Sequence, residues 1–211
     1  MIDDMDYHIT AWHKVLNDLG ANLGIERVKQ ECYGKNHELL ERIFPGRFSF
    51  EEKDRMSYDK EKAYQVAFKP RLKLINGLSE FLEEARQAGV RMAVGSAAIM
   101  FNIDFVLDGM NIRSYFDAIV SADDVAESKP NPETFLKCAE RLGASAGESI
   151  VFEDTPKGVE AALNAGMRAV VITTLHEPEE FSHLPNVIDF AGDYTTLKHL
   201  IPKHSFKEVL P

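Results

Sequence analysis

The apolar residues follow a purely helical period in the first third of the chain. Over residues 5–68 they recur every three or four positions, which predicts helices over about 5–20 and 26–32, a third that ends at Pro45, and a fourth from 49 to 68. Ser49 and Glu52 predict a capping box at the start of the fourth helix. Its buried side is expected to carry Met56, Ala63, Tyr64 and Ala67. Its many charges (EEKDR, DKEK) are expected to form a solvated face.

After Pro70 the pattern changes to short apolar runs that alternate with helical segments. Strands are predicted over 91–94, 118–120, 150–153, 169–172 and 187–190, and helices over 77–88, 97–109, 132–142, 155–166 and 194–201. Such alternation indicates a parallel sheet covered on both faces. The predicted fold is therefore α/β: a Rossmann-like, doubly wound core formed by residues 1–4 and 71–211, with an α-helical cap over 5–70. The charged tail from Lys203 is expected to be frayed.

Composition narrows the class of protein further. The 211 residues are 45% hydrophobic and 27% charged, which suits a globular domain, and the net charge of −10 disfavours nucleic-acid binding. Cys32 and Cys138 lie in no metal-ligand or redox spacing, which suggests reduced thiols in a cytoplasmic protein. No apolar run approaches the roughly 20 residues of a membrane span, and the acidic start does not resemble a signal peptide. We expect no membrane partner, and either a monomer or a dimer.

The stretch SIVFEDTPKGVEAALNAG carries the first candidate chemistry. A buried strand ends in two acids, Glu153 and Asp154, and Thr155 and Pro156 have the residue types that begin a helix. Acids at the carboxyl end of a parallel strand stand where α/β proteins build their sites, and adjacent oxygen ligands without Cys or His suit Mg²⁺. Taken alone, the stretch is equally compatible with an acidic, solvated turn between a strand and a helix.

Two further strand ends carry polar groups. Ser96 follows the strand Met92-Ala93-Val94-Gly95 and precedes a helix, so its hydroxyl and nearby N–H groups predict either an anion site or an ordinary helix cap. Lys129, between Ser128 and Pro130, is either a phosphate-binding ammonium in a stiff loop or a surface lysine. A serine, a lysine and an acid pair at successive strand ends together favour a site that neutralises a phosphoryl group.

With these residues in view, SKPNPETF and VFEDTPKGVEAALNAG resemble the third and fourth motifs of the haloacid dehalogenase superfamily. The helical region and the Tyr7-His8-xxx-Trp12 stretch resemble its β-phosphoglucomutase-like subfamily, over essentially the whole chain. The resemblance implies phosphoryl transfer through a phospho-aspartate, with Mg²⁺ and a small phosphorylated metabolite such as a sugar phosphate. It implies phosphate binding by Ser96, Ala97 and Lys129, metal binding by Asp154 and Glu153, with Asp154 favoured for direct contact, and substrate contact from the cap residues His8, Lys35 and Asn36.

The first motif of that family, a strand ending DxDGT or DxDGV with the nucleophile as its first aspartate, has no match in the 211 residues. MIDDMDYHITAW resembles the segment that follows that motif, which places Asp3 and Asp4 at the hinge between core and cap. We therefore expect this chain to be inactive as it stands, and the hypothesis is that it is an N-terminally truncated product. An upstream DNA sequence without an in-frame FDxDGT-like segment would contradict that hypothesis.

Three classes of function remain to be compared. The favoured one is a Mg²⁺-dependent phosphatase, because water is the default acceptor; a β-phosphoglucomutase-type phosphohexomutase would need a second phosphate site on the cap, for which Lys35 is a candidate. A catalytically silent protein that binds a phosphorylated ligand is the alternative from another class, and ligand would then raise its thermal stability without turnover. The early helical region disfavours a receiver domain, and the lack of GxGxxG disfavours a dinucleotide-binding protein.

Overall fold

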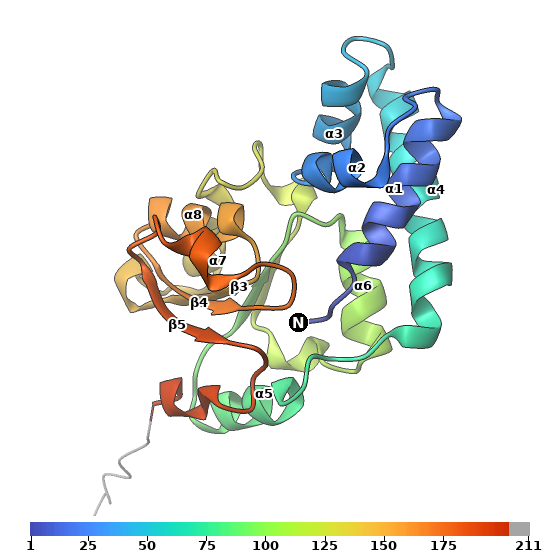
Figure 1. Ribbon diagram of the computed structural model, residues 1–211. Coiled ribbons are helices and arrows are strands. Elements are labelled where there is room, and N and C mark those ends of the chain that lie inside the picture. The colour runs from blue at the N-terminus through green and yellow to red at the C-terminus, as the bar shows by residue number, and fades with distance from the viewer. Residues whose placement is uncertain (203–211) are drawn as a thin grey trace, which may run out of the picture.

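The computed structural model describes residues 1–202, so the expected fraying of the tail from Lys203 falls outside the described residues. Figure 1 shows the chain as two lobes, a helical cap and an α/β core. The cap contains α1 (Met5–Asp18), α2 (Ile25–Glu31), α3 (Asn36–Ile43) and α4 (Phe50–Phe68). The core contains α5 (Leu78–Gln87), α6 (Met100–Gly109), α7 (Glu133–Leu142) and α8 (Pro156–Asn164). Its strands are β1 (Ala93–Gly95), β2 (Ala118–Val120), β3 (Ile150–Glu153), β4 (Arg168–Ile172) and β5 (Val187–Ala191).

The cap has a hydrophobic core of its own. Trp12 and Leu16 of α1 pack with Val28 of α2 and with Leu39 and Leu40 of α3, and all five are at most 2% exposed. The predicted capping box begins α4: the Glu52 amide donates to the Ser49 hydroxyl at 3.2 Å, and the Ser49 amide donates to the Glu52 carboxylate at 2.8 Å. Packing of their apolar side chains into this cap core, more than helix propensity, stabilises the short helices α1, α2 and α3.

The predicted inner face of α4 is correct for Tyr64 and Met56, which are buried and partly buried, and wrong for the other two residues. Ala63 and Ala67 are exposed, whereas Lys60 and Glu61 from the supposedly solvated charge run are 2% and 3% exposed. The inner face also carries Tyr64. Lys60 and Glu61 can be buried because they pair with each other and with polar groups of neighbouring helices, which offsets the cost of removing them from water.

Strand β4 shows why the core is covered on both faces. Ala169 and Val171 point to one side, where they pack with α7 and α8, and Val170 and Ile172 point to the other, where they pack with α5 and α6. All four are at most 3% exposed. Successive side chains of a strand point to opposite faces, so a strand with helices on both sides is apolar throughout. The predicted doubly wound α/β core is confirmed.

The strands form two parallel sheets. One contains β1 and β2, and the other has the order β3-β4-β5. Within residues 1–202 no strand forms hydrogen bonds with strands of both sheets. The two sheets are joined instead by a cluster of apolar side chains that includes Val94 and Val170. Met1 packs against this cluster, and its carbonyl accepts a hydrogen bond from the Ile75 amide at 2.9 Å. In Figure 1 the N-terminus accordingly lies between the β3-β4-β5 sheet and α6.

Two predicted elements differ in the structure. The last segment forms only a short 3-10 helix over Leu197–Leu200 rather than an α-helix over 194–201. The helix after β1 begins at Met100, because residues 96–99 form a loop. None of the helices in residues 1–202 is both long and apolar enough to span a bilayer. The domain boundaries at residues 4 and 70 stay a prediction.

Candidate active site

Lys129 connects the carboxyl ends of the two sheets. Its ammonium donates to the carbonyl of Gly95, the last residue of β1, at 3.3 Å, and to the carboxylate of Glu153, the last residue of β3. The side chains of Lys129 and Glu153 are only 13% and 9% exposed, so little water screens their attraction. Two strand ends that lie far apart in the sequence thus meet at one cation, as parallel-strand topology predicts.

Glu153 is held as a carboxylate by its surroundings. One oxygen accepts from Lys129, and the other accepts from the amides of Asp154 and Thr155 at 3.1 and 3.3 Å. Burial opposes its ionisation, but the Lys129 charge and these hydrogen bonds outweigh burial and keep the pKa of Glu153 below its usual value. Thr155 also caps α8, as predicted, because its hydroxyl accepts from the Gly158 amide at 3.1 Å.

Asp154 is in the opposite electrostatic situation. Burial, and then the negative charge of neighbouring Glu153, raise its pKa to about 6. Lys129 forms its ion pair with Glu153 rather than with Asp154. Burial and the neighbouring charge make the ionised form of Asp154 unfavourable, and a metal cation beside the carboxylate would stabilise that form. Asp154 is therefore the better candidate for direct metal contact.

The acid pair fits Mg²⁺ by chemistry. Mg²⁺ is usually held by one or two carboxylates and otherwise keeps waters or substrate oxygens as ligands. Among residues 1–202 no group of three or more His, Cys, Asp or Glu side chains forms a complete protein cage. Asp154 would therefore hold the ion directly, and Glu153 would orient Lys129 beside it. This assignment stays a prediction.

Ser96 and Ala97 lie in the loop that follows β1. The Ser96 amide donates to the Val120 carbonyl at 2.9 Å, and its hydroxyl accepts from the Ala98 amide at 3.1 Å. The expectation that Ser96 stands at a helix N-terminus is wrong, because α6 begins at Met100. Ser96 still adjoins Gly95, whose carbonyl contacts Lys129, so the serine and lysine positions do come together. Phosphate binding by Ser96 and Ala97 stays a prediction.

The turn that contains Lys35 binds the core beside Lys129. The Lys35 amide donates to the hydroxyl of Ser128 at 2.9 Å and to the carboxylate of Glu38 at 3.0 Å. Glu38 in turn accepts from the Ser128 amide at 3.3 Å. The Lys35 ammonium donates to the backbone carbonyls of Val125 and Ala126. Lys35 therefore joins cap to core in this structure, and no contact here tests its predicted role as a substrate ligand.

The predicted cap residues His8 and Asn36 meet at a buried cluster that the sequence reasoning missed. Lys60 donates to Glu61 at 2.9 Å and to Nδ1 of His8 at 2.7 Å, and Asn36 donates to Glu61 at 2.7 Å. The sequence contained one indication of this burial, because Lys60, Glu61 and Tyr64 share the helical face that leads to Phe68. The charge density of that segment concealed it.

Asp3 and Asp4 lie directly before α1, where the chain enters the cap. The Asp4 carboxylate accepts from the Tyr64 hydroxyl and lies 3.3 Å from Nε2 of His8. Burial opposes ionisation of Asp4, but hydrogen bonds from His8 and Tyr64 and the nearby positive charge keep its pKa below its usual value. Asp3 is exposed and lines a crevice of about 440 Å³ with Arg71 and Lys73. These positions support their interpretation as hinge residues.

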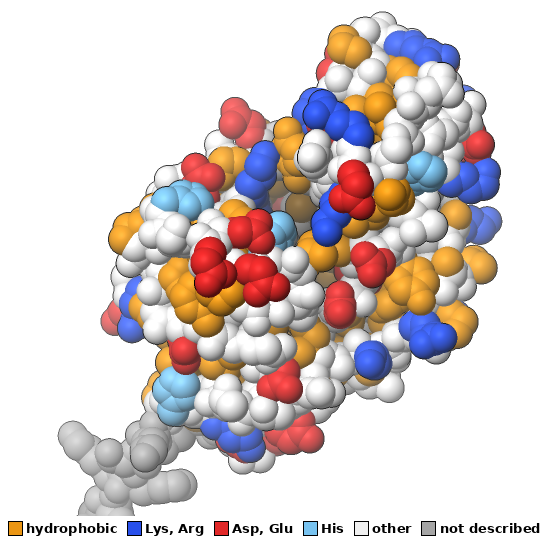
Figure 2. Space-filling view, viewed as in Figure 1, with side chains coloured by type: hydrophobic (Ala, Val, Ile, Leu, Met, Phe, Trp, Pro, Cys, Tyr) orange, Lys and Arg blue, Asp and Glu red, His pale blue; other side chains and the backbone are white. Residues whose placement is uncertain are grey.

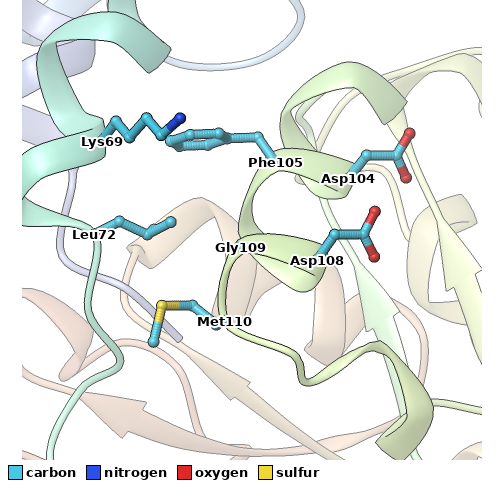
Figure 3. Close-up of a pocket in the computed structure, with 7 residues that line it drawn as sticks. All are labelled: Lys69, Leu72, Asp104, Phe105, Asp108, Gly109 and Met110. Atoms are coloured by element: carbon cyan, nitrogen blue, oxygen red, sulfur yellow. The ribbon is translucent and has the colours of Figure 1, made fainter.

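A second crevice of about 390 Å³ lies on the hinge side of α6. Figure 3 shows the Lys69 side chain alongside the Phe105 ring, with Leu72 and Met110 below them. The carboxylates of Asp104 and Asp108 point away from Lys69 in this view and pair with Arg113. The crevice contains none of the predicted site residues, so it is distinct from the Lys129 site.

The geometry defines a class: a Rossmann-like core with acids and a lysine at its strand ends, covered by a helical cap. The chain matches the family model of haloacid dehalogenase-like hydrolases over residues 1–172. It is 34% identical over 185 residues to an uncharacterised protein of Haemophilus influenzae, covering 82% of this chain and 86% of that protein. It is 44% identical over 84 residues to fructose-1-phosphate phosphatase of Escherichia coli, covering 40% of this chain and 45% of that enzyme.

Solved structures agree with the sequence comparisons. β-Phosphoglucomutase of Clostridium difficile superimposes with a TM-score of 0.80 at 25% identity, covering 94% of this chain and 89% of that one. A haloacid dehalogenase hydrolase of Entamoeba histolytica gives 0.81 at 23% identity, with 92% and 89% covered. The chain belongs to the haloacid dehalogenase-like hydrolases, and its relatives and structural neighbours include phosphatases and phosphomutases.

Proposed function

We propose that this protein binds a small phosphorylated metabolite, such as a sugar phosphate, together with Mg²⁺, and that its site is built for transfer of the phosphoryl group to water. The observation that carries the proposal is the Lys129 ammonium, which lies between the Gly95 carbonyl and the Glu153 carboxylate. Asp154 follows Glu153 directly. A cation and a metal-binding acid at one sheet edge are what a phosphoryl group needs for charge neutralisation.

Each residue then has a defined task. Lys129 would attract phosphoryl oxygens, Glu153 would hold that ammonium in place, and Asp154 would hold Mg²⁺. The metal would supply positive charge to the phosphoryl oxygens. The Ser128–Lys35 contact would keep the cap against this edge and limit the access of water. The positions of Lys129, Glu153 and Asp154 support these roles.

The Asp4 carboxylate already contacts Tyr64 and His8, and Asp3 lies in the exposed crevice of about 440 Å³. We therefore propose that neither aspartate attacks phosphorus. The 211-residue chain alone would therefore bind phosphate esters without releasing phosphate. A chain preceded by an added apolar strand ending in Asp-x-Asp would gain turnover, and an added strand ending in Asn-x-Asn is its matched control.

Thermal unfolding with and without inorganic phosphate and Mg²⁺ tests the proposal directly. We expect both ligands to raise the Tm, and expect Lys129→Ala and Asp154→Asn to remove the increase caused by phosphate and by Mg²⁺, respectively. Lys198→Ala, which removes a surface lysine paired with Glu84, is the control that should keep both increases. Phosphate release from sugar phosphates is then measured for the chain with and without the added strand. An absence of both stabilisation and turnover would refute the function.

A further inference from the structure

The crevice on the hinge side of α6 lies between the cap and the core, away from Lys129. Its volume of about 390 Å³ is within the range of small-molecule sites. One wall is the linker that leaves α4, made of the 3-10 helix Lys69–Arg71 and of Leu72, and the other wall is the C-terminal half of α6. Figure 2 shows apolar side chains beside Lys and Arg side chains at the lower right of the molecule, where α4 ends in Figure 1.

The crevice has an apolar lining. Phe105 of α6, Leu72 of the linker and Met110, which follows α6, line it and are each half-buried. Phe105 and Leu72 belong to none of the hydrophobic clusters found within residues 1–202. Gly109 lets Leu72 lie against α6, because a methyl group added to this glycine would stand 2.8 Å from Cδ2 of Leu72. An apolar ligand group would therefore cover side-chain surface that no hydrophobic core of the described residues uses.

Lys69 provides a positive charge at one end of this apolar surface. It is exposed, and it takes part in none of the ion pairs of the part of the chain that the structure describes. The two acids that also line the crevice are engaged by Arg113, which lies 2.6 Å from Oδ1 of Asp104 and 2.6 Å from Oδ1 of Asp108. Figure 3 shows both carboxylates pointing away from Lys69. The four charges balance and the Lys69 ammonium is left without a carboxylate, which favours a monoanion over a cation or a dianion.

We propose that this crevice binds a small amphipathic carboxylate, with its charged group at the Lys69 ammonium and its apolar part against Leu72 and Met110. Figure 3 supports this orientation, because Lys69 lies beside Phe105 at one end and the other two side chains lie below them. The ligand contacts the linker and α6 at the same time. It therefore stabilises the position that the linker has against α6, and with it the position of the cap relative to the core.

NMR titration and calorimetry with octanoate test the proposal, and octanamide is the neutral ligand of the same shape. We expect octanoate to bind with a Kd of about 1 mM or tighter, as suits a ligand of roughly ten non-hydrogen atoms in an open crevice. Octanamide should bind about threefold more weakly or worse, because it cannot form the ion pair. The NMR signals that shift should include the methyl groups of Leu72 and Met110.

Two matched variants identify the charged contact. Lys69→Met removes the charge but keeps an apolar stem of similar length, so octanoate and octanamide should then bind alike. Lys73→Met makes the same change on the same linker, but Lys73 lines the neighbouring crevice of about 440 Å³, so the preference for octanoate should remain. Leu72→Ala removes part of the apolar wall and should weaken both ligands severalfold.

The proposal is overturned if octanoate shows no saturable binding in the millimolar range, or if the shifted signals lie outside the crevice. It is also overturned if octanoate and octanamide bind alike in the unmodified chain, if Lys69→Met keeps the preference, or if Lys73→Met abolishes it. The comparison of the two ligands and the Lys69→Met result decide the question even if Leu72→Ala does not fold. The experiment uses neither phosphate nor Mg²⁺, so its result is independent of the proposed function.

Discussion

Gly158 gives the sharpest test of the packing around the acid pair. It lies in the first turns of α8, and a methyl group added to it would stand 2.1 Å from the carboxylate carbon of Glu153 and 2.2 and 2.3 Å from its oxygens. Such distances are impossible, so Gly158→Ala must displace the Glu153 side chain. That displacement would break its bonds to Lys129 and to the amides of Asp154 and Thr155.

Two opposing terms set the expected effect on stability. Replacing Gly by Ala inside a helix ordinarily stabilises by up to about 1 kcal/mol. Breaking a buried ion pair while both charges stay buried costs about 3–5 kcal/mol. We therefore expect Gly158→Ala to lower the free energy of unfolding by roughly 3 kcal/mol, a Tm decrease of about 6–12 °C for a chain of this size. Thermal and urea unfolding measure both quantities.

A double-mutant cycle identifies the cause. With Glu153→Ala already present, the space beside Gly158 is open, so Gly158→Ala should become neutral or stabilising. Gly147→Ala is the control, because nothing lies within 4 Å of a methyl group at that position. If Gly158→Ala alone stabilises the protein as an ordinary helix substitution would, the described position of the Glu153 carboxylate is wrong.

Three further predictions test other parts of the structure. Because the pKa of Asp154 is about 6, protons compete with Mg²⁺, and calorimetry should show Mg²⁺ affinity falling about tenfold from about pH 7 to about pH 5; a flat profile contradicts the metal assignment. Ser49→Ala should cost about 1 kcal/mol in thermal unfolding, since it removes the cap of α4; an unchanged Tm would contradict this. Hydrogen bonds from Ser121 and Arg141 lower the pKa of Asp124 to about 2, so Asp124→Asn should destabilise by about 1 kcal/mol at neutral pH. That deficit should shrink as the pH falls from about 4 to about 2, and a constant deficit would refute the sign.

Much of the core was predictable because its signals are local and simple. β2 begins and ends at the predicted residues, and the predicted cap of α8 by Thr155 is present. Residues 169–172 of β4 form an unbroken apolar run because helices bury both faces of the strand. The meeting of Lys129 with Glu153 follows from topology, since parallel strands bring their carboxyl ends to one edge.

The buried Lys60–Glu61 pair in the cap was harder to predict, because charged side chains can be buried only where other polar groups pair with them. Lys60 and Glu61 have the composition of a solvated helix face, and only their partners His8, Asn36 and Asn102 make burial possible. Those partners come from three other helices, so the helical face shared with Tyr64 indicates that the two charges are buried, but the sequence around residue 60 does not identify what they pair with. The same limit applies to Lys35, whose contacts with Val125, Ala126 and Ser128 are about 90 residues away.

The contact of Lys129 with both Gly95 and Glu153 has a thermodynamic consequence. In this structure the Lys129 ammonium links two sheets that share no backbone hydrogen bonds among residues 1–202. Under the proposed function, a phosphoryl group would draw this ammonium towards itself and weaken its two contacts. Ligand binding would then be coupled to the rigidity of the junction between the sheets, and amide hydrogen exchange at the ends of β1 and β3 should respond to added phosphate.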